Sequence, residues 1–316
     1  MNAAKTILEM PIQNKNNFAM ELAELVSRAT TIRRDEPLAK HTTLRVGGPA
    51  DVYVEPSSEA DLAKVVKYCG ERSLPFFILG RGSNLLVRDG GFRGVVICLA
   101  HPDFGKIEIA GERLVCGAGV KLKNVAVEAR RNSLSGVEFL EGIPGSVGGA
   151  LRMNAGAMGG ATFDAVESVR LMDFDGDVRE LMPKEMSVEY RSCATLKNHI
   201  ALGAVFKCKT LPREEIEKRM KEFSEKRWES QPAAPSAGCI FKNPEKIPAG
   251  RLVDELGLKG ARVGGAVVSA EHGNFIVNDS NATARDVLEL ITILKARAKE
   301  ARGIELHTEV EIIGED

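Results

Sequence analysis

Two glycine-rich segments carry the clearest chemical signals in this chain of 316 residues. The first reads Gly-Arg-Gly-Ser-Asn over residues 80–84 and directly follows an apolar run at 75–79. Glycine there permits positive φ angles, and successive amide groups in such a turn can bind an anion. The segment contains neither a Walker A pattern nor the Gly-x-Gly-x-x-Gly fingerprint. By itself it indicates either an anion-binding turn or a structural turn that ends a strand.

The second segment covers residues 142–160 and begins GIPGSVGGA. Its crowd of small residues is typical of neither a helix nor a strand. The composition favours a backbone that presses against a bulky flat ligand, with a tight bend in a sheet as the alternative. Two separate loops of this kind predict a long ligand with a central diphosphate.

Bulk composition narrows the possible partners. The net charge is −1, which argues against nucleic acid. Six cysteines are scattered without a Cys-x-x-Cys pair, which argues against zinc and for free thiols in a reducing compartment. No apolar run has the length of a signal peptide or a membrane helix. We therefore expect a cytoplasmic protein without a metal ion or membrane insertion, present as a monomer or a weak oligomer.

An α+β arrangement is expected to position the two glycine-rich segments. Apolar spacing predicts a helical lead-in over residues 1–40. A strand at 51–56, a helix that starts at Ser58 and a buried strand at 75–79 predict a first α/β subdomain over 41–80. A second subdomain, 81–212, is expected to hold an antiparallel or mixed sheet and one helix at 122–131. Its strands are expected at 85–87, 95–98, 106–110, 113–116, 166–173, 178–181 and 200–209.

A third region, residues 213–316, is expected to form a separate domain. Helices are predicted at 213–228 and 284–302, with short strands between them and a last strand at 304–314. Capping-box patterns place helix starts at Ser58 with Asp61 and at Thr283 with Asp286, and Gly303 is placed to end the last helix.

Seven segments together resemble the UDP-N-acetylenolpyruvoylglucosamine reductases. They read HTTLRVGGPAD, GRGSNLLV, GIPGSVGGALRMNAGA, YRSC, PSAGCIFKNP, PAGRLVDELGLKG and LHTEVEIIG. They occur in the family's order, with a spacing similar to its shorter type, which lacks a long extra substrate loop. The resemblance implies an α+β, FAD-binding fold of the vanillyl-alcohol-oxidase or p-cresol methylhydroxylase kind, with a C-terminal α+β substrate-binding domain.

The resemblance also implies an activity, that of UDP-N-acetylmuramate dehydrogenase in peptidoglycan precursor synthesis. NADPH would reduce non-covalently bound FAD. Hydride would then pass to the enol-ether double bond of the UDP-sugar substrate, and a protein acid would protonate the neighbouring carbon. The residues implied to hold FAD are Gly80, Arg81, Gly82, Ser83, Asn84, Gly145, Ser146, Gly148, Gly149, Asn154, Ala155 and Gly156.

Three residues match catalytic positions of the family. Arg191 matches its arginine, and a planar guanidinium suits a substrate carboxylate beside developing negative charge. Glu309 matches its glutamate, which would stabilise the enolic intermediate. It shares a face of the predicted last strand with His307 and Glu311, opposite Leu306. Without the other motifs, an arginine after a tyrosine is usually a surface residue, and such a glutamate is usually only solvated.

The third position departs from the commoner family pattern. Cys239 stands where the family usually has serine before an aromatic-Lys-Asn-Pro run, and Ile240 separates it from Phe241. A thiol, with an ordinary pKa of about 8.5, is a stronger acid than an alcohol, so cysteine is a reasonable proton donor. Inert packing is the usual role of a free thiol in an apolar setting.

Five further residues are expected to contact the substrate. Lys242 and Asn243 directly follow the proton-donor motif, and Tyr190 could stack or hydrogen-bond over the site. Arg227 and Gln231 lie at the end of the helix expected at 213–228.

Two other functions fit part of this pattern. An FAD oxidase on the same fold often tethers its flavin through a histidine in the first glycine loop, but residues 80–84 contain none. A non-catalytic flavin or nucleotide-sugar binder would not need Arg191, Cys239 and Glu309 together.

Overall fold

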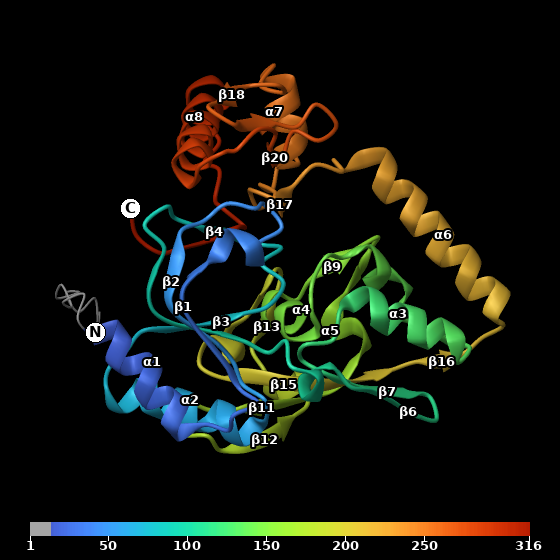
Figure 1. Cartoon of the computed structure of the whole chain (residues 1–316). Coiled ribbons are helices and arrows are strands. Elements are labelled where there is room, and N and C mark those ends of the chain that lie inside the picture. The colour runs from blue at the N-terminus through green and yellow to red at the C-terminus, as the bar shows by residue number, and fades with distance from the viewer. Residues whose placement is uncertain (1–13) are drawn as a thin grey trace.

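The first sheet carries the turn at residues 80–84. The computed structural model describes residues 14–316 (Figure 1). The sheet has the strand order β1-β2-β5-β3, in which β5 pairs in parallel with both β2 and β3 while β1 pairs antiparallel with β2. Its strands are β1 (Thr31–Pro37), β2 (Pro49–Glu55), β3 (Phe76–Leu79) and β5 (Phe92–Cys98). Helices α1 (Asn14–Leu25) and α2 (Glu59–Glu71) pack against one face.

The helical prediction for the first forty residues is wrong in its second half. The part of this prediction that covers residues 1–13 lies outside the described residues. Within them, α1 accounts for the helical spacing, but Thr31–Pro37 forms strand β1. This strand is a mostly exposed edge strand, so it lacks the apolar alternation that marks a half-buried strand. Its register is set instead by its pairing with β2, from Thr31 opposite Glu55 to Pro37 opposite Pro49.

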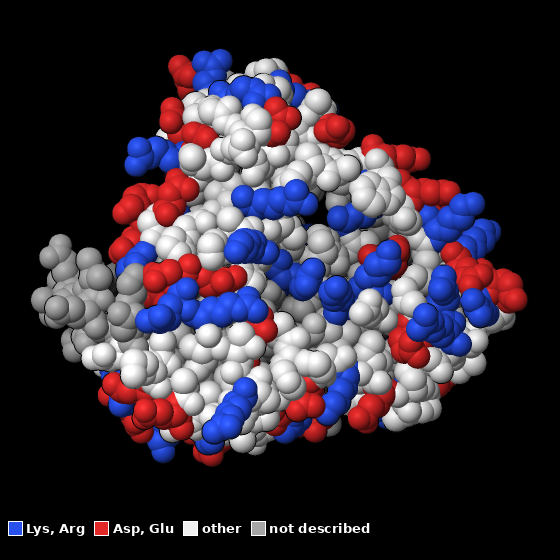
Figure 2. All heavy atoms as spheres, viewed as in Figure 1, with Lys and Arg blue, Asp and Glu red and all other residues white. Residues whose placement is uncertain are grey.

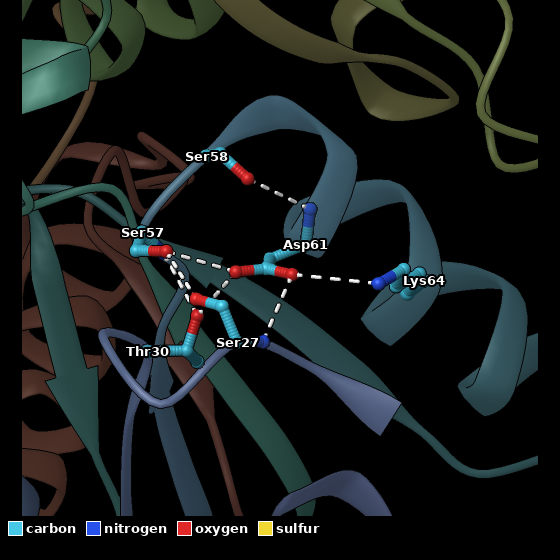
Figure 3. A network of polar contacts seen from close by, with 6 residues as sticks. All are labelled: Ser27, Thr30, Ser57, Ser58, Asp61 and Lys64. Atoms are coloured by element: carbon cyan, nitrogen blue, oxygen red, sulfur yellow. Dashed lines mark hydrogen bonds and ion pairs between the residues drawn. The ribbon is translucent and has the colours of Figure 1, made fainter. Parts of the chain in front are cut away.

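Asp61, in the first turn of α2, links this helix to the segment that precedes β1. Ser58 is the N-cap and accepts a hydrogen bond from the Asp61 backbone N–H, as predicted. The Asp61 carboxylate does not complete the capping box; it is 3% exposed and accepts hydrogen bonds from Ser27 N, Thr30 Oγ1 and Ser57 Oγ (Figure 3). Burial raises the pKa of this carboxyl, but the hydrogen bonds outweigh burial and lower the pKa to about 2. The carboxylate therefore fastens α2 to the segment that joins α1 to β1.

We expect Asp61→Asn to destabilise the fold in a pH-dependent way. The lowered pKa, compared with the ordinary 3.8, corresponds to about 2 kcal/mol of stability at neutral pH. Because the folded-state pKa is depressed, this contribution is present above pH 4 and is lost as the pH falls towards 2. Urea unfolding should show that the difference in free energy of unfolding between variant and wild type is smaller at pH 3.5 than at pH 7. Asp103→Asn, at an exposed carboxylate, should leave the free energy of unfolding unchanged; a constant gap for Asp61→Asn would contradict the linkage.

The second sheet is fully antiparallel and has the order β12-β11-β15-β7-β6. Its strands are β6 (Ile107–Ala110), β7 (Arg113–Gly117), β11 (Val166–Met172), β12 (Val178–Leu181) and β15 (Ile200–Lys207). Helix α3 (Leu122–Arg131), where a helix was predicted, packs with this sheet in one core. Short elements nearby are β8 (Leu134–Ser135), β9 (Gly156–Ala157), β10 (Gly160–Ala161), α5 (Thr162–Ala165), β13 (Val188–Glu189), β14 (Ser192–Cys193) and β16 (Lys209–Thr210).

The second glycine-rich segment contains a helix, contrary to the sequence-based expectation. Residues Val147–Met153 form α4, whose C-cap Asn154 takes a left-handed conformation. The glycines serve close packing here: Gly148 N donates to Ala118 O, and a Cβ added at Gly148 would lie 3.1 Å from the Ala118 Cβ. Helix propensity alone disfavours glycine, so tertiary packing decides this element.

The third region lies above the two sheets in Figure 1, and the long helix α6 leads to it along one side of the molecule. Its elements are α6 (Arg213–Ser230), β17 (Ser236–Cys239), α7 (Ala249–Glu255), β18 (Arg262–Val263), β19 (Ala266–Val268), β20 (Phe275–Asn278) and α8 (Ala284–Arg302). The strands form a sheet of order β17-β20-β19-β18. The Thr283–Asp286 capping box and the left-handed C-cap at Gly303 bound α8 as predicted.

The end of the chain returns to the first part of the molecule. Strand β21 (Glu311–Ile313) pairs in parallel with β4 (Leu85–Val87), directly after the first glycine-rich turn. The strand predicted over 304–314 is thus only three residues long, because Leu306 and Val310 are buried in the core of the third region instead of in a ladder. No helix within residues 14–316 has both the length and the apolar character to cross a membrane.

Candidate active site and cofactor cavity

A cavity of about 770 Å³ lies where the first sheet, the second sheet and α4 meet. Parallel strands β2, β3 and β5 end at it, and their carboxyl ends contribute Glu55, Gly80 and Cys98 to its lining. The carboxyl ends of parallel strands are the usual place for a ligand in such sheets. The volume falls within the range of cofactor pockets.

The two glycine-rich segments meet at this cavity. A Cβ added at Gly80 would approach Ser146 Oγ at 3.0 Å and the Gly149 Cα at 3.8 Å. A Cβ at Gly149 would meet only Ser146 Oγ, at 3.6 Å. The backbone of both loops is therefore open to a ligand, and five of the predicted cofactor residues line the cavity: Gly80, Arg81, Ser146, Gly148 and Gly149.

The charge of the lining suits an anionic ligand. Five basic side chains and a single carboxylate, Glu55, border the cavity; the basic residues are Lys40, Arg81, Lys121, Arg152 and Lys197. Figure 2 shows Lys and Arg side chains gathered around a hollow in the middle of this face. Glycine backbones together with converging cations fit a bulky cofactor with a diphosphate. Of these basic residues only Arg81 was predicted from the sequence, because side chains from distant loops converge only in the fold.

The other predicted cofactor residues lie outside the lining of this cavity. Gly82 faces backbone, since an added Cβ would lie 2.2 Å from His41 O. The Asn84 side chain donates to Glu309 O at 3.1 Å, and that of Asn154 donates to Glu189 O. Contacts of these residues with FAD stay a prediction, as they do for Ser83, Gly145, Ala155 and Gly156.

Arg191 occupies a turn that L-residues rarely adopt. It is the second of two residues between β13 and β14, with φ of +56°, a value that favours glycine. Such strain in a non-glycine residue is typical of functional sites. Arg191 Nη1 donates to Gly156 O at 3.0 Å, and Nε lies 3.2 Å from Glu309 Oε1. That Nε is buried and lacks an aligned hydrogen bond within the described residues, so the pair is held by charge rather than by ideal geometry.

Cys239 ends β17 beside the first glycine-rich turn. Thr43 Oγ1 donates to Ser236 O at 2.6 Å while Thr43 N donates to Gly82 O, which ties β17 to that turn. Burial and, to a smaller extent, the Glu309 charge raise the pKa of the Cys239 thiol to about 11, although Arg191 and Asn274 act to lower it. The three predicted catalytic residues, 191, 239 and 309 in the sequence, therefore share one electrostatic environment.

The backbone of Glu309 is hydrogen-bonded both to the segment after Cys239 and to the first glycine-rich turn. Its N–H donates to Ile240 O at 2.8 Å, next to Cys239, and its carbonyl accepts from the Asn84 side chain. The carboxyl is 12% exposed; burial raises its pKa, and the charges of Arg191 and Lys242 oppose that rise. Asn84 was predicted as a cofactor residue, but its contact with Glu309 was not. The buried Asn274, which contacts Phe241, was not predicted at all, because a lone asparagine carries no periodic signal.

The predicted substrate residues are spread around this site. Tyr190 is 62% exposed, with its ring 5.5 Å from the Arg191 guanidinium carbon. Lys242 is exposed and lies near enough to Glu309 to influence its pKa. Asn243 Oδ1 accepts from Ala249 N at 3.0 Å, which ties up this oxygen at the start of α7.

Arg227 and Gln231 lie at the end of α6. Arg227 is half-buried, and this burial lowers its pKa. A Cβ at Gly142 would lie 3.6 Å from its Cδ. Gln231 N donates to Arg227 O. These contacts place both residues beside the second glycine-rich segment, and their part in substrate binding stays a prediction.

Comparison with known proteins identifies first the class and then the family. Residues 50–182 match the FAD binding domain family, and residues 231–313 match the family described as UDP-N-acetylenolpyruvoylglucosamine reductase, C-terminal domain. The chain is thus an FAD-dependent oxidoreductase, with the predicted α+β, FAD-binding fold and C-terminal domain.

Full-length relatives narrow this class. UDP-N-acetylenolpyruvoylglucosamine reductase of Syntrophomonas wolfei is 43% identical over 90% of this chain and 96% of its own length. The enzyme of Clostridium botulinum is 42% identical over 95% and 98%. The crystal structure of the Thermus caldophilus enzyme superposes with a TM-score of 0.78 at 41% identity, covering 90% of this chain and 98% of that one. The chain belongs to the UDP-N-acetylenolpyruvoylglucosamine reductase family.

Proposed function

We propose that this protein uses NADPH to reduce the enolpyruvyl group of UDP-N-acetylenolpyruvoylglucosamine to UDP-N-acetylmuramate. One observation carries the proposal: Arg191, Cys239 and Glu309 converge beside the glycine-rich turn that borders the cavity. Gly80, Arg81, Ser146 and Gly149 would hold FAD there, with Lys121 available to its phosphates. Arg152 also lines the cavity, where it pairs with Glu311 at 2.9 Å. FAD, when bound, supplies hydride transfer from NADPH to the substrate's double bond.

Cys239 is the proposed proton donor. Hydride addition leaves an electron pair on the carbon beside the substrate carboxylate, and the thiol proton forms the new C–H bond there. The S–H bond breaks, and a water proton then restores the thiol. A raised pKa keeps the thiol protonated at neutral pH and makes its thiolate a strong base that regains a proton readily.

Arg191 and Glu309 are the proposed stabilisers of the intermediate. A guanidinium is a fixed positive charge that matches a carboxylate with two parallel hydrogen bonds. A guanidinium carries five N–H donors, and Nη1 of Arg191 uses one of them for Gly156 O, so donors remain for the substrate carboxylate. Glu309, with its raised pKa, can share a proton with the enolic oxygen.

The raised pKa of Cys239 predicts an unusual pH profile. A reaction that needs the protonated thiol should keep its rate through pH 9.5 and decline only as the pH approaches 11. Single-turnover reoxidation of the reduced enzyme by substrate, measured from pH 7 to 10, checks this. Cys239→Ser should show no thiol-dependent decline at all. A half-maximal loss near pH 8.5, the value of an ordinary thiol, would contradict the buried environment.

Gly149→Leu should abolish FAD binding without unfolding the chain. A side chain at this position meets only Ser146 Oγ at its Cβ, and beyond that atom it enters the cavity. Leucine is also the better helix former in α4. The purified variant should be colourless, with a circular dichroism spectrum like that of the wild type. Gly70→Leu, in α2 where an added Cβ meets nothing, is the matched control and should stay yellow. A yellow Gly149→Leu protein would place FAD elsewhere.

The proposed reaction separates cleanly from its two alternatives. The reductase should be yellow, bleached anaerobically by NADPH and recoloured by the enolpyruvyl substrate. Rapid bleaching by simple alcohols would instead support an oxidase on the same fold. A protein that binds the UDP-sugar but shows no turnover would support a binding protein.

A further inference from the structure

A buried amide stands behind the strand that carries Cys239. The Asn274 side chain is 3% exposed; Oδ1 accepts from Phe241 N at 2.9 Å, and Nδ2 donates to Phe241 O at 2.8 Å. The Asn274 carbonyl also accepts from Ile240 N at 2.9 Å. One residue therefore satisfies three backbone groups of the two residues that follow the thiol.

The ordinary sheet ladder is interrupted where these contacts occur. Strand β17 pairs with β20 at Ser236 and at Cys239, with an irregularity between them, and Gly238 has φ of +75°. Beyond Cys239 the strand ends, so its conformation depends on contacts from outside the ladder. The Asn274 side chain also lies close enough to the Cys239 thiol to lower its pKa against the effect of burial.

The same segment sets the spacing between two proposed catalytic residues. Ile240 O accepts from Glu309 N, and Phe241 forms an isolated bridge with Thr308. A shift of the segment at Ile240 and Phe241 would therefore displace Cys239 and Glu309 relative to each other.

We propose that Asn274 is a positioning residue that holds the Cys239 thiol in line for proton transfer. The inference rests on the proposed function of Cys239. Only an amide of this size offers one acceptor and one donor to a single backbone residue at buried depth; a carboxylate or an aliphatic side chain leaves Phe241 N or O without a partner.

Asn274→Asp tests the inference with an isosteric change. The carboxylate keeps the acceptor for Phe241 N but puts an oxygen against Phe241 O. We expect reoxidation of the reduced flavin by enolpyruvyl substrate to slow by about 10²-fold, the usual cost of a small misplacement of a reacting group. Flavin reduction by NADPH should stay within twofold of the wild type. In a Cys239→Ala background the same change should add little, because the group that Asn274 positions is gone.

Asn278→Ala is the matched control. Asn278 ends β20, the strand that begins directly after Asn274. Its side-chain amide also joins two backbone groups, Leu44 O and Ala282 N, neither of which belongs to the segment from Cys239 to Phe241. It should cost comparable stability and leave reoxidation unchanged. If reoxidation of the flavin slowed equally in both variants, the role of Asn274 would be structural only.

Thiol alkylation gives a readout that does not depend on the reaction. Iodoacetamide labelling, read by peptide mass spectrometry, should be several-fold slower at Cys239 in Asn274→Asp, because the variant loses the contact that favours the thiolate and places a second carboxylate near it. The fully buried Cys69 should stay protected and thereby report on folding. Asn274→Ser serves if the aspartate variant exposes Cys69. If the wild type is not reoxidised by substrate, the proposed function fails, and labelling still decides the inference. If Asn274→Asp changes neither the labelling of Cys239 nor the reoxidation of the flavin, Asn274 does not position the thiol.

Discussion

Cys239→Ala should stop the second half-reaction while leaving the first intact. A positioned general acid contributes about 10²–10⁴-fold, so reoxidation of the reduced flavin by substrate should slow by that factor. Reduction by NADPH should proceed at the wild-type rate, because the thiol plays no part in it. Cys239→Ser, which retains a hydroxyl proton in the same place, should keep much of the activity. Anaerobic stopped-flow absorbance of the flavin separates the two half-reactions.

A second cysteine provides the control for this experiment. Cys69→Ala removes a fully buried thiol from α2, so it should lower stability and leave both half-reactions unchanged. If Cys239→Ala turned over the enolpyruvyl substrate at a near-normal rate, Cys239 would not be the proton donor, and the acid would have to be sought elsewhere in the site.

Arg191→Lys should be nearly as damaging as removal of the side chain. Arg191 contacts Gly156 O and Glu309 at once and still presents a donor, and a lysine has neither the planar fork nor the reach for all three. Removing one preorganised charge from a site costs about 10²–10³-fold in turnover. The loss should appear in reoxidation of the flavin by substrate rather than in its reduction by NADPH.

Arg113→Lys tests whether any arginine–glutamate pair would behave in this way. Arg113 pairs with Glu167 at 2.9 Å on the surface of the second sheet, and exposed pairs contribute little. Its substitution should leave both half-reactions unchanged. A loss of flavin reduction in Arg191→Lys, equal to the loss of reoxidation, would assign Arg191 to the cofactor or to NADPH rather than to the intermediate.

Local patterns predicted the parts of the fold whose causes are local. The boundaries of α8 follow from Thr283, Asp286 and Gly303, which act within one turn of the helix ends. Helix α3 and strand β12 likewise lie where apolar spacing and turn residues placed them. The motif resemblance predicted that Arg191, Cys239 and Glu309 act together. The structure brings their side chains within electrostatic range of one another, and their catalytic roles stay a prediction.

Features with distant causes were not predictable in this way. Strand β1 is a polar edge strand defined by its partner β2, and α4 forms through packing of Gly148 on Ala118 despite its composition. The side chains of Asn84 and Asp61 form contacts more than 30 residues away, so their neighbours in sequence do not disclose them. The basic side chains around the cavity likewise come from segments that are distant in sequence and meet only in the fold.

The most direct test of the central claim is the stoichiometry of the complete reaction under anaerobic conditions. The purified, yellow protein is given limiting UDP-N-acetylenolpyruvoylglucosamine and excess NADPH, and both NADPH and flavin absorbance are followed. The account predicts one NADPH oxidised per substrate consumed, UDP-N-acetylmuramate as the product, and a flavin that bleaches once the substrate is exhausted. NADPH oxidation that is independent of the substrate, or a flavin that NADPH reduces and the substrate never reoxidises, would contradict it.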